Sequence, residues 1–143
     1  MVNREIIVET ARAFKGTPFA HQGRRPGVAL DCAGVIICDA NEVGLAVDFD
    51  FLGYGRYPKP SLVRAQLVKN LDFIAGGIAA AQTGDVAWIA DHGYATHLAI
   101  LAERDGYLTM IHSSQRDGGV IEERVGADEA YEVRGVFRFR GID

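Results

Sequence analysis

The stretch Asp31-Cys32-Ala33-Gly34-Val35-Ile36-Ile37 marks the junction between a loop and an apolar helix. The Gly- and Arg-rich residues 22–27 before it are unsuited to a helix. After it, apolar residues recur at helical spacing until Gly44, which predicts that the helix ends there. Asp31 is therefore expected to cap the helix N-terminus, and Cys32 lies in the first helical turn.

The position of Cys32 favours a chemical role for its thiol. Unpaired backbone N–H groups and the positive end of the helix dipole both stabilise a thiolate. The alternative is a place in the core, since free cysteines are among the most buried residues of soluble proteins. Cys38, in the middle of the apolar run, is expected to have that core role. The two cysteines lie about 240° apart around the helix, so no disulfide between them is expected.

The composition is that of one globular domain spanning residues 1–143. The formal net charge of −4 argues against a nucleic-acid partner, although Arg24 and Arg25 form a local basic spot. Residues 1–10 include acidic side chains and no apolar segment, so we expect no signal peptide and synthesis in the cytoplasm. The apolar runs are too short to insert into a membrane.

Two further helices are expected, one on each side of the Cys32 helix. Asn3 caps the first, which ends near Gly16, and its predicted buried residues are Ile6, Ile7, Ala11 and Phe14. Ser61 is expected to cap the other, which runs to about Leu71 and whose apolar residues are Leu62, Ala65, Leu67 and Val68. Residues 45–60 form either a surface loop or one wall of a groove, and their aromatic residues are Phe49, Phe51, Tyr54 and Tyr57.

From residue 84 onward, the pattern changes to short apolar and β-branched runs separated by turn residues. Strands are predicted at residues 86–90, 96–103, 107–113, 120–125 and 133–140. Helices first and strands second predict an α+β fold, in which N-terminal helices pack on a C-terminal antiparallel β-sheet.

Asp105-Gly106, between two of these strands, is a strong signal for a two-residue hairpin turn. This turn sets a register in which Ala99 lies opposite His112. His97 is then on the same face as His112 and diagonal to it, close enough for the two side chains to meet. A thiol nucleophile needs a base, and the base needs an orienting group. Cys32, His97 and His112 are predicted to supply these roles in that order.

Several motifs follow one another along the chain: Asp31-Cys32-Ala33-Gly34-Val35, Thr83-Gly84-Asp85-Val86, Thr96-His97-Leu98-Ala99-Ile100-Leu101 and Met110-Ile111-His112-Ser113. In this order they resemble the NlpC-type cell-wall peptidases, which are papain-like cysteine hydrolases with a circularly rearranged core. Three other stretches resemble the branch of that family found in phage tails and gene-transfer agents: Gly16-Thr17-Pro18-Phe19, His21-Gln22-Gly23-Arg24 and Gly135-Val136-Phe137-Arg138-Phe139.

The resemblance implies a papain-like fold in which Cys32 is the nucleophile, His97 the general base and His112 the polar residue that orients the base. It also implies hydrolysis of peptide bonds in peptidoglycan stem peptides through a thioester acyl-enzyme, with no cofactor and no metal. Asp31 is expected to act as an N-cap, and no other Asp or Glu has a predicted part in the chemistry. The residues expected to contact the substrate are Phe19, His21 and Asp31, the last of which also caps the helix.

The same resemblance implies action at the cell wall, with phage tail proteins as candidate partners and the virion tail as a candidate location. The family often has a tyrosine where this chain has Phe19, so a hydroxyl contact to the thiol is lost or supplied from elsewhere. Two other functions stay open: a non-catalytic tail-assembly component on the same fold, and a thiol amidase or acyltransferase with another substrate. A metal site at His97 and His112 lacks a carboxylate or second thiol at ligand spacing.

Overall fold

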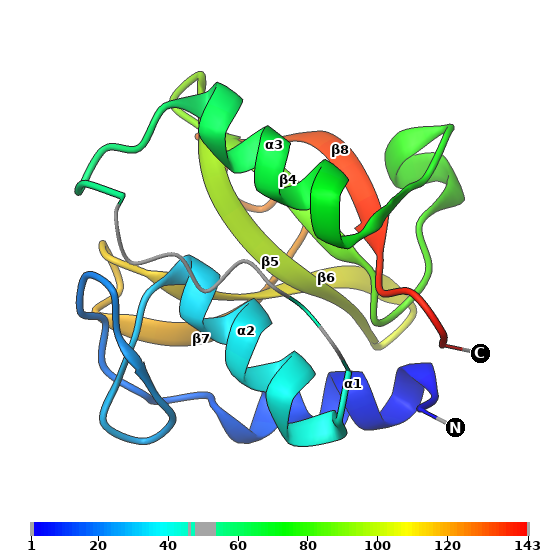
Figure 1. Ribbon diagram of the computed structural model, residues 1–143, viewed down its shortest axis with the longest axis horizontal. Coiled ribbons are helices and arrows are strands. Elements are labelled where there is room, and N and C mark those ends of the chain that lie inside the picture. The colour runs from blue at the N-terminus through cyan, green and yellow to red at the C-terminus, as the bar shows by residue number, and fades with distance from the viewer. Residues whose placement is uncertain (1, 46, 48–53, 143) are drawn as a thin grey trace.

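The computed structural model describes residues 2–45, 47 and 54–142. Its helices are α1 (Arg4–Ala13), α2 (Cys32–Val43) and α3 (Pro60–Asn70), with a short 3-10 helix, η1 (Gly77–Ala80). Its strands are β1 (Arg24–Arg25), β2 (Ala29–Leu30), β3 (Asp72–Phe73), β4 (Val86–Asp91), β5 (Tyr94–Arg104), β6 (Tyr107–Ser114), β7 (Gly119–Arg124) and β8 (Tyr131–Arg138). The predicted α+β arrangement of helices packed on an antiparallel sheet is confirmed (Figure 1).

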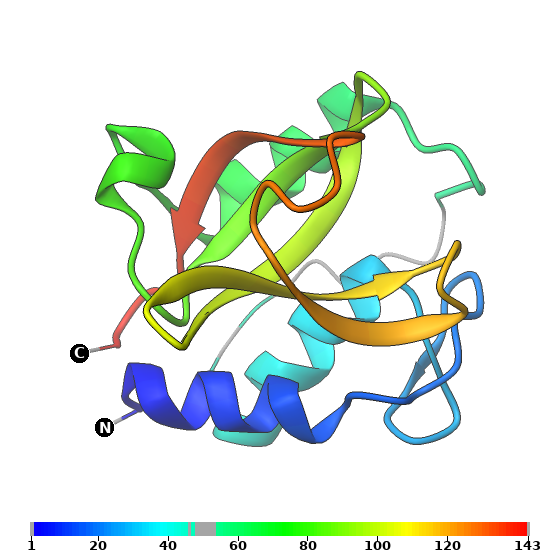
Figure 2. The same cartoon turned by 180° about the vertical axis from the view of Figure 1, so that it is seen from behind.

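The main sheet positions the elements that carry the candidate site. Within the described residues its strand order is β3-β8-β4-β5-β6-β7, and each neighbouring pair is antiparallel. Figures 1 and 2 show that the sheet is strongly twisted and that α2 and α3 lie on the same side of it. Both helices contact β5, so the N-terminus of α2 comes close to the strand that carries His97.

The apolar core lies between the helices and the sheet. Most of α2 is buried, and Cys38 is only 7% exposed, which confirms its predicted core position. The prediction that Ile6 of α1 is buried is wrong, since its side chain is 43% exposed. Val8 takes its place beside Ile7 and Ala11, because Ile6 and Val8 lie on opposite edges of the same stripe and α1 docks on the edge that carries Val8.

The start of α3 differs from the prediction by two residues. Pro60 is the first helical residue and Lys59 the N-cap, so Ser61 lies inside the helix and does not cap it. Proline is suited to this position because the first helical N–H has no partner within the helix. Val68 is 47% exposed, whereas its neighbour Leu67 is buried.

Each predicted strand is present, with ends shifted by one or two residues, and the short edge strand β3 was not predicted. The turn between β5 and β6 has positive φ at both central positions, 54° at Asp105 and 82° at Gly106, as a type I′ hairpin turn requires. Arg104 pairs with Tyr107, and the same register continues along both strands. The predicted hairpin is therefore confirmed.

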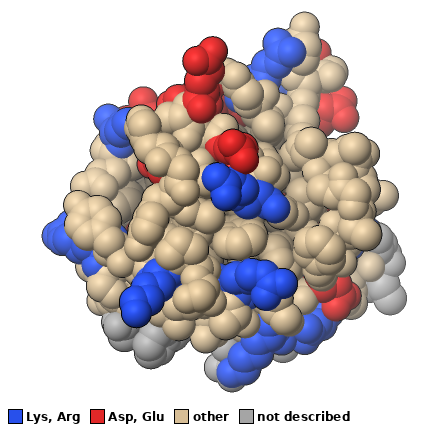
Figure 3. All heavy atoms as spheres, turned by 90° about the horizontal axis from the view of Figure 1, so that it is seen from above, with Lys and Arg blue, Asp and Glu red and all other residues tan. Residues whose placement is uncertain are grey.

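The surface shows charges of both signs. On the face seen in Figure 3, Lys and Arg side chains are scattered over the middle and the edges, with acidic side chains among them. Among residues 2–45, 47 and 54–142, no helix has the length and apolar character needed to cross a membrane.

Candidate active site

The N-terminus of α2 is held by Asp31, whose side chain is buried and fully engaged. One carboxylate oxygen accepts from the backbone N–H of Gly34 and from the Arg24 guanidinium, each at 2.8 Å. The other oxygen accepts from the backbone N–H of Gln22 at 2.9 Å and from the Tyr54 hydroxyl. The N-cap role of Asp31 is therefore confirmed, and its substrate contact stays a prediction.

Cys32 opens α2, as predicted, but its thiol is not in the expected electrostatic state. Burial raises the pKa of Cys32 to about 12, and the negative charge of Asp31 acts in the same direction. Backbone hydrogen bonds of Leu98 and Ala33 act the opposite way and are outweighed. The prediction of a thiolate stabilised by the helix N-terminus is wrong, because desolvation exceeds the helix effect. The thiol lies 3.8 Å from the carbonyl oxygen of Thr96, to which it donates.

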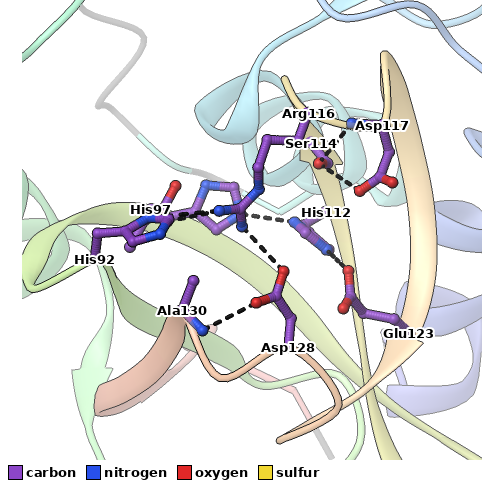
Figure 4. Close-up of polar contacts among 10 residues, drawn as sticks. His92, His97, His112, Ser114, Arg116, Asp117, Glu123, Asp128 and Ala130 are labelled. Carbon is purple, nitrogen blue, oxygen red and sulfur yellow. Dashed lines mark hydrogen bonds and ion pairs between the residues drawn. The ribbon is translucent and has the colours of Figure 1, made fainter.

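His97 on β5 and His112 on β6 meet as predicted. Nε2 of His97 lies 2.7 Å from Nδ1 of His112, and the two rings are perpendicular at 4.9 Å between centroids (Figure 4). Tyr131 of β8 stacks on His97, with ring centroids 5.3 Å apart and an interplanar angle of 17°. The predicted placement of both imidazoles on one face of the sheet is confirmed.

His112 is also hydrogen-bonded to Glu123, on the neighbouring strand β7. Nε2 of His112 lies 2.8 Å from a carboxylate oxygen of Glu123, so the groups form a line from Glu123 through His112 to His97 (Figure 4). Burial lowers the pKa of His112, while the hydrogen bond and the charge of Glu123 act to raise it. Burial lowers the pKa of His97 to about 3, and the charges of His112 and Arg116 add to this effect.

Arg116, in the loop between β6 and β7, brings a positive charge close to the histidines. Its guanidinium lies over the Tyr131 ring, 4.5 Å from the centroid, and pairs with Asp91 at 3.3 Å and Asp128 at 3.2 Å. Figure 4 shows the contacts of its guanidinium with His92 and Asp128, and its charge lowers the pKa of both His97 and His112. Because this cation disfavours a second positive charge nearby, it contributes to keeping both imidazoles neutral.

Cys32 and His97 line the same cavity, which has a volume of about 700 Å³. Phe19 and His21 also line it, and so does part of the segment that was expected to be a surface loop or a groove wall. Of that segment, residues 54–58 form a wall of the cavity, whereas Phe49 and Phe51 lie outside the described residues. Within the described part of the chain, no hydrogen bond joins the Cys32 thiol to His97.

A second, smaller cavity of about 70 Å³ adjoins the other side of Cys32. It lies between the start of α2, the α3 helix and β5, and its lining is mostly aliphatic. The residues that line it are Cys32, Ala33, Tyr54, Pro58, Leu62, Val63, Gln66, Leu67, Thr96 and Leu98. The thiol therefore lies at the boundary between a polar and an apolar compartment.

Sequence reasoning missed Glu123, Arg116 and Tyr131, and it named Tyr54 only as part of a segment that could form a groove wall. Tyr54 donates to Asp31 and accepts a hydrogen bond from Arg24 at 2.6 Å, and it lines both cavities. A tyrosine hydroxyl thus contacts Asp31, the residue before Cys32, although Phe19 carries none. Glu123 could have been found by extending the strand register from His112, which pairs with residue 121 and so places residue 123 diagonally on the same face.

No protein-family model and no curated protein matches the chain. Solved structures do match it. One is the NlpC/p60 domain of the peptidoglycan hydrolase SagA, with a TM-score of 0.63 and 22% identity over 96% of this chain and 100% of that domain. The fold is that of the NlpC/P60 domain.

Two further structures share the NlpC/P60 fold. One is an NlpC/P60 family protein from Bacillus cereus ATCC 10987, with a TM-score of 0.68 and 22% identity over 96% of this chain and 40% of that one. The other is a protein from Staphylococcus aureus subsp. aureus Mu50 described as similar to lipoprotein, NLP/P60 family, with a TM-score of 0.65 and 19% identity over 95% of this chain and 41% of that one. The present chain thus spans about two fifths of the length of these two proteins, and at such identities the likeness concerns the fold.

Proposed function

We propose that this protein is a cysteine peptidase that hydrolyses peptide bonds in the stem peptides of peptidoglycan. The observation that carries the proposal is that Cys32 and His97 line the same cavity, while Nε2 of His97 is hydrogen-bonded to His112. A nucleophile, a base and an orienting group in this order are what acyl transfer by a thiol requires. The NlpC/P60 fold of the chain, shared with a domain named as part of a peptidoglycan hydrolase, supports the choice of substrate.

The proposed reaction starts from a neutral thiol and a neutral imidazole. Sγ of Cys32 attacks the carbonyl carbon of the scissile amide while its proton passes to His97. The C–N bond then breaks, His97 returns the proton to the leaving amine, and a thioester to Cys32 remains. A water molecule deprotonated by His97 attacks the thioester, which releases the carboxylic acid and restores the thiol.

The backbone N–H of Cys32 is the proposed donor to the oxyanion. N–H groups in the first turn of a helix have no acceptor within that helix. In α2, the Asp31 carboxylate accepts from one of them, that of Gly34, while the N–H of Val35 makes the first regular helical bond, to the Asp31 carbonyl. The N–H of Cys32 lies beside the nucleophile and is left for the substrate oxygen.

The test is incubation with purified peptidoglycan, followed by mass analysis of the released fragments. The wild type is expected to release stem-peptide fragments, and Cys32→Ala should lower the rate by at least about 10³-fold. Cys38→Ala removes the other thiol, which lies in the core, and should keep the activity of the wild type. His97→Ala should be nearly as damaging as Cys32→Ala, and His112→Ala less so, because water can partly replace an orienting group. Wild-type activity in Cys32→Ala would disprove the enzyme proposal.

Other outcomes of the same experiment favour the alternatives. If no wall fragments appear but Cys32 forms a thioester with another acyl donor, the protein is a thiol amidase or acyltransferase on that substrate. If Cys32 forms no acyl adduct with any donor, the non-catalytic component is favoured. A chelator is expected to leave the hydrolysis unchanged, because only a thiol and an imidazole take part.

We further propose that the enzyme is carried by a phage tail or a gene-transfer agent, on the resemblance of residues 16–19, 21–24 and 135–139 to that branch. Tail proteins would then bring it to the cell wall. Proteomic analysis of purified particles from the source cells tests this proposal. The chain should be found in intact particles in a fixed ratio to the tail proteins, and its absence from them would leave a free wall hydrolase.

A further inference from the structure

We infer that Glu123 is a positioning residue of this site, which holds His112 and, through it, His97 in the tautomers that leave Nδ1 of His97 free to accept a proton. The inference deepens the proposed function and rests on it for the reaction, while the tautomers themselves can be measured without any substrate. It begins from two short contacts, 2.8 Å between Glu123 and His112 and 2.7 Å between His112 and His97.

The tautomer of His112 follows from the chemistry of its partner. A carboxylate accepts hydrogen bonds and donates none. The nitrogen of His112 that faces Glu123, Nε2, therefore carries a proton. Because burial lowers the pKa of His112, the ring is neutral and has only this one proton. Its Nδ1 is left as an acceptor.

The tautomer of His97 follows in turn. Its Nε2 faces the acceptor Nδ1 of His112 and must donate to it. His97 is also neutral, since its pKa is lowered to about 3 by burial first and by the neighbouring charges second. Its only proton is thus on Nε2, and Nδ1 has a free lone pair. Within the described residues no group hydrogen-bonds that nitrogen, so it is available to the Cys32 proton.

Glu123 also compensates the charge that appears during the reaction. When His97 takes the proton of Cys32, it becomes an imidazolium close to the guanidinium of Arg116, which opposes it. The Glu123 carboxylate is the negative group at the other end of the hydrogen-bonded line (Figure 4). Such partners behind a reactive histidine fix its tautomer and raise its basicity.

Long-range ¹H–¹⁵N spectra of labelled protein read the tautomers directly. In the wild type both rings should be protonated on Nε2, and Nδ1 of His97 should resonate as an unprotonated nitrogen. In Glu123→Ala the preference should be lost. In Glu123→Gln a mixture is expected, because the amide can either accept from His112 or donate to it. Glu123→Asp keeps the charge and should restore the wild-type tautomers at least in part.

Glu132→Gln is the matched control, since Glu132 is an exposed glutamate on β8 that pairs with Arg134 and lies outside the line of histidines. It should leave every resonance of the two rings unchanged. Thermal unfolding of each variant shows whether it is folded. A wild-type His97 protonated on Nδ1, or His97 signals that do not change in folded Glu123→Ala, would overturn the inference.

The reactivity of Cys32 provides a second readout. The rate of alkylation of Cys32 by iodoacetamide near neutral pH should fall by about tenfold to a hundredfold in Glu123→Ala. The pH at which His97 takes up a second proton, read from the same ¹⁵N spectra, should move lower in Glu123→Gln, because the imidazolium loses its compensating charge. A purely structural role would lower the alkylation rate without moving the pH at which His97 is protonated. These measurements need no peptidoglycan, so a protein that fails to cleave the wall can still show them, and the two proposals can fail separately.

Discussion

Cys32 shows how opposing influences act on a single residue. The first turn of α2 offers it unpaired N–H groups, which favour a thiolate. Its burial and the neighbouring Asp31 favour the neutral thiol, and together they raise its pKa to about 12. Desolvation acts on the whole charge, whereas the helix terminus contributes about half a charge at its end. The resting site is therefore neutral, and in the proposed reaction the proton moves during the attack on the substrate.

This balance predicts how alkylation of Cys32 depends on pH. A raised thiol pKa leaves little thiolate at neutral pH, so the alkylation rate should rise by about tenfold per pH unit between pH 7 and pH 9 without reaching a plateau. Peptide mapping after timed iodoacetamide pulses measures this rate. A plateau below pH 8 would mean that the thiolate is stabilised after all and would contradict the neutral resting state.

Cys38 is the internal control for that measurement. It is buried in the core and donates to the carbonyl oxygen of Arg24 at 3.3 Å. In the native protein it should react more slowly than Cys32 at every pH, since Cys32 borders two cavities. Unfolding should remove the difference between the two thiols. Equal labelling of both in the native protein would argue against Cys32 as the nucleophile.

The positions of Cys32, His97 and His112 in the fold could be predicted from the sequence, but their protonation states could not. The cap before Cys32 and the Asp105-Gly106 turn are local signals, and they are enough to bring His97 beside His112. Burial is a property of the folded chain, so the neutral thiol could not be read from the sequence. Glu123 was missed because its register depends on the loop between β6 and β7, whose pairing is less constrained than a two-residue turn.

Among the elements, those with strong local signals were predicted best. α2 has an N-cap at Asp31 and a left-handed Gly44 at its end, and both ends were predicted correctly. α3 has neither signal, and its N-cap makes no side-chain hydrogen bond, so its start was misplaced. In α1 the choice between Ile6 and Val8 depends on how the helix docks, which is decided by its tertiary contacts rather than by its spacing.

The docking of α1 includes a buried ion cluster on β7. Glu122 accepts two hydrogen bonds from Arg12 of α1 at 3.0 Å and one from Thr109 of β6 at 2.7 Å. Its side chain is only 2% exposed. Burial acts to raise the pKa of Glu122, but the hydrogen bonds from Arg12 and Thr109 outweigh it and lower the pKa to about 2. One carboxylate therefore ties the first helix to two strands.

This cluster predicts a specific loss of stability in acid. Because the folded-state pKa of Glu122 is below its value in the unfolded chain, the carboxylate stabilises the fold above about pH 4.5. That contribution, at most about 3 kcal/mol, should be lost as the pH falls toward 2. Glu122→Gln should be less stable at pH 7 and should show a flatter decline of the unfolding free energy between pH 5 and pH 2. Glu132→Gln, at an exposed site, should follow the wild type, and a similarly steep decline in Glu122→Gln would refute the assignment.

At the scale of the whole molecule, the fold separates two kinds of surface around the thiol. On one side lies the large cavity with His97, Arg116 and Asp91, which suits a polar or charged part of a substrate. On the other side, α3 packs on β5, and the two elements line a small aliphatic pocket beside Cys32. A stem peptide has both characters, since its carboxylates and amides alternate with methyl and methylene groups. The pocket is therefore expected to hold an aliphatic group next to the scissile bond.

Filling the aliphatic pocket tests this division of the cleft. Val63→Phe adds a ring where α3 lines the pocket, and it should lower kcat/KM for stem-peptide hydrolysis by about tenfold or more, because a substrate group loses its place. Iodoacetamide is small and reaches the thiol from the large cavity, so the alkylation rate of Cys32 should not change. Val68→Phe is the matched control, with the same substitution on the same helix at a site that is 47% exposed and outside the pocket. It should keep the wild-type kcat/KM.

If Val63→Phe slows alkylation and hydrolysis equally, the ring has displaced the thiol itself, and the pocket has no demonstrated part in binding. If Val63→Phe hydrolyses the wall as fast as the wild type, the substrate does not enter the pocket.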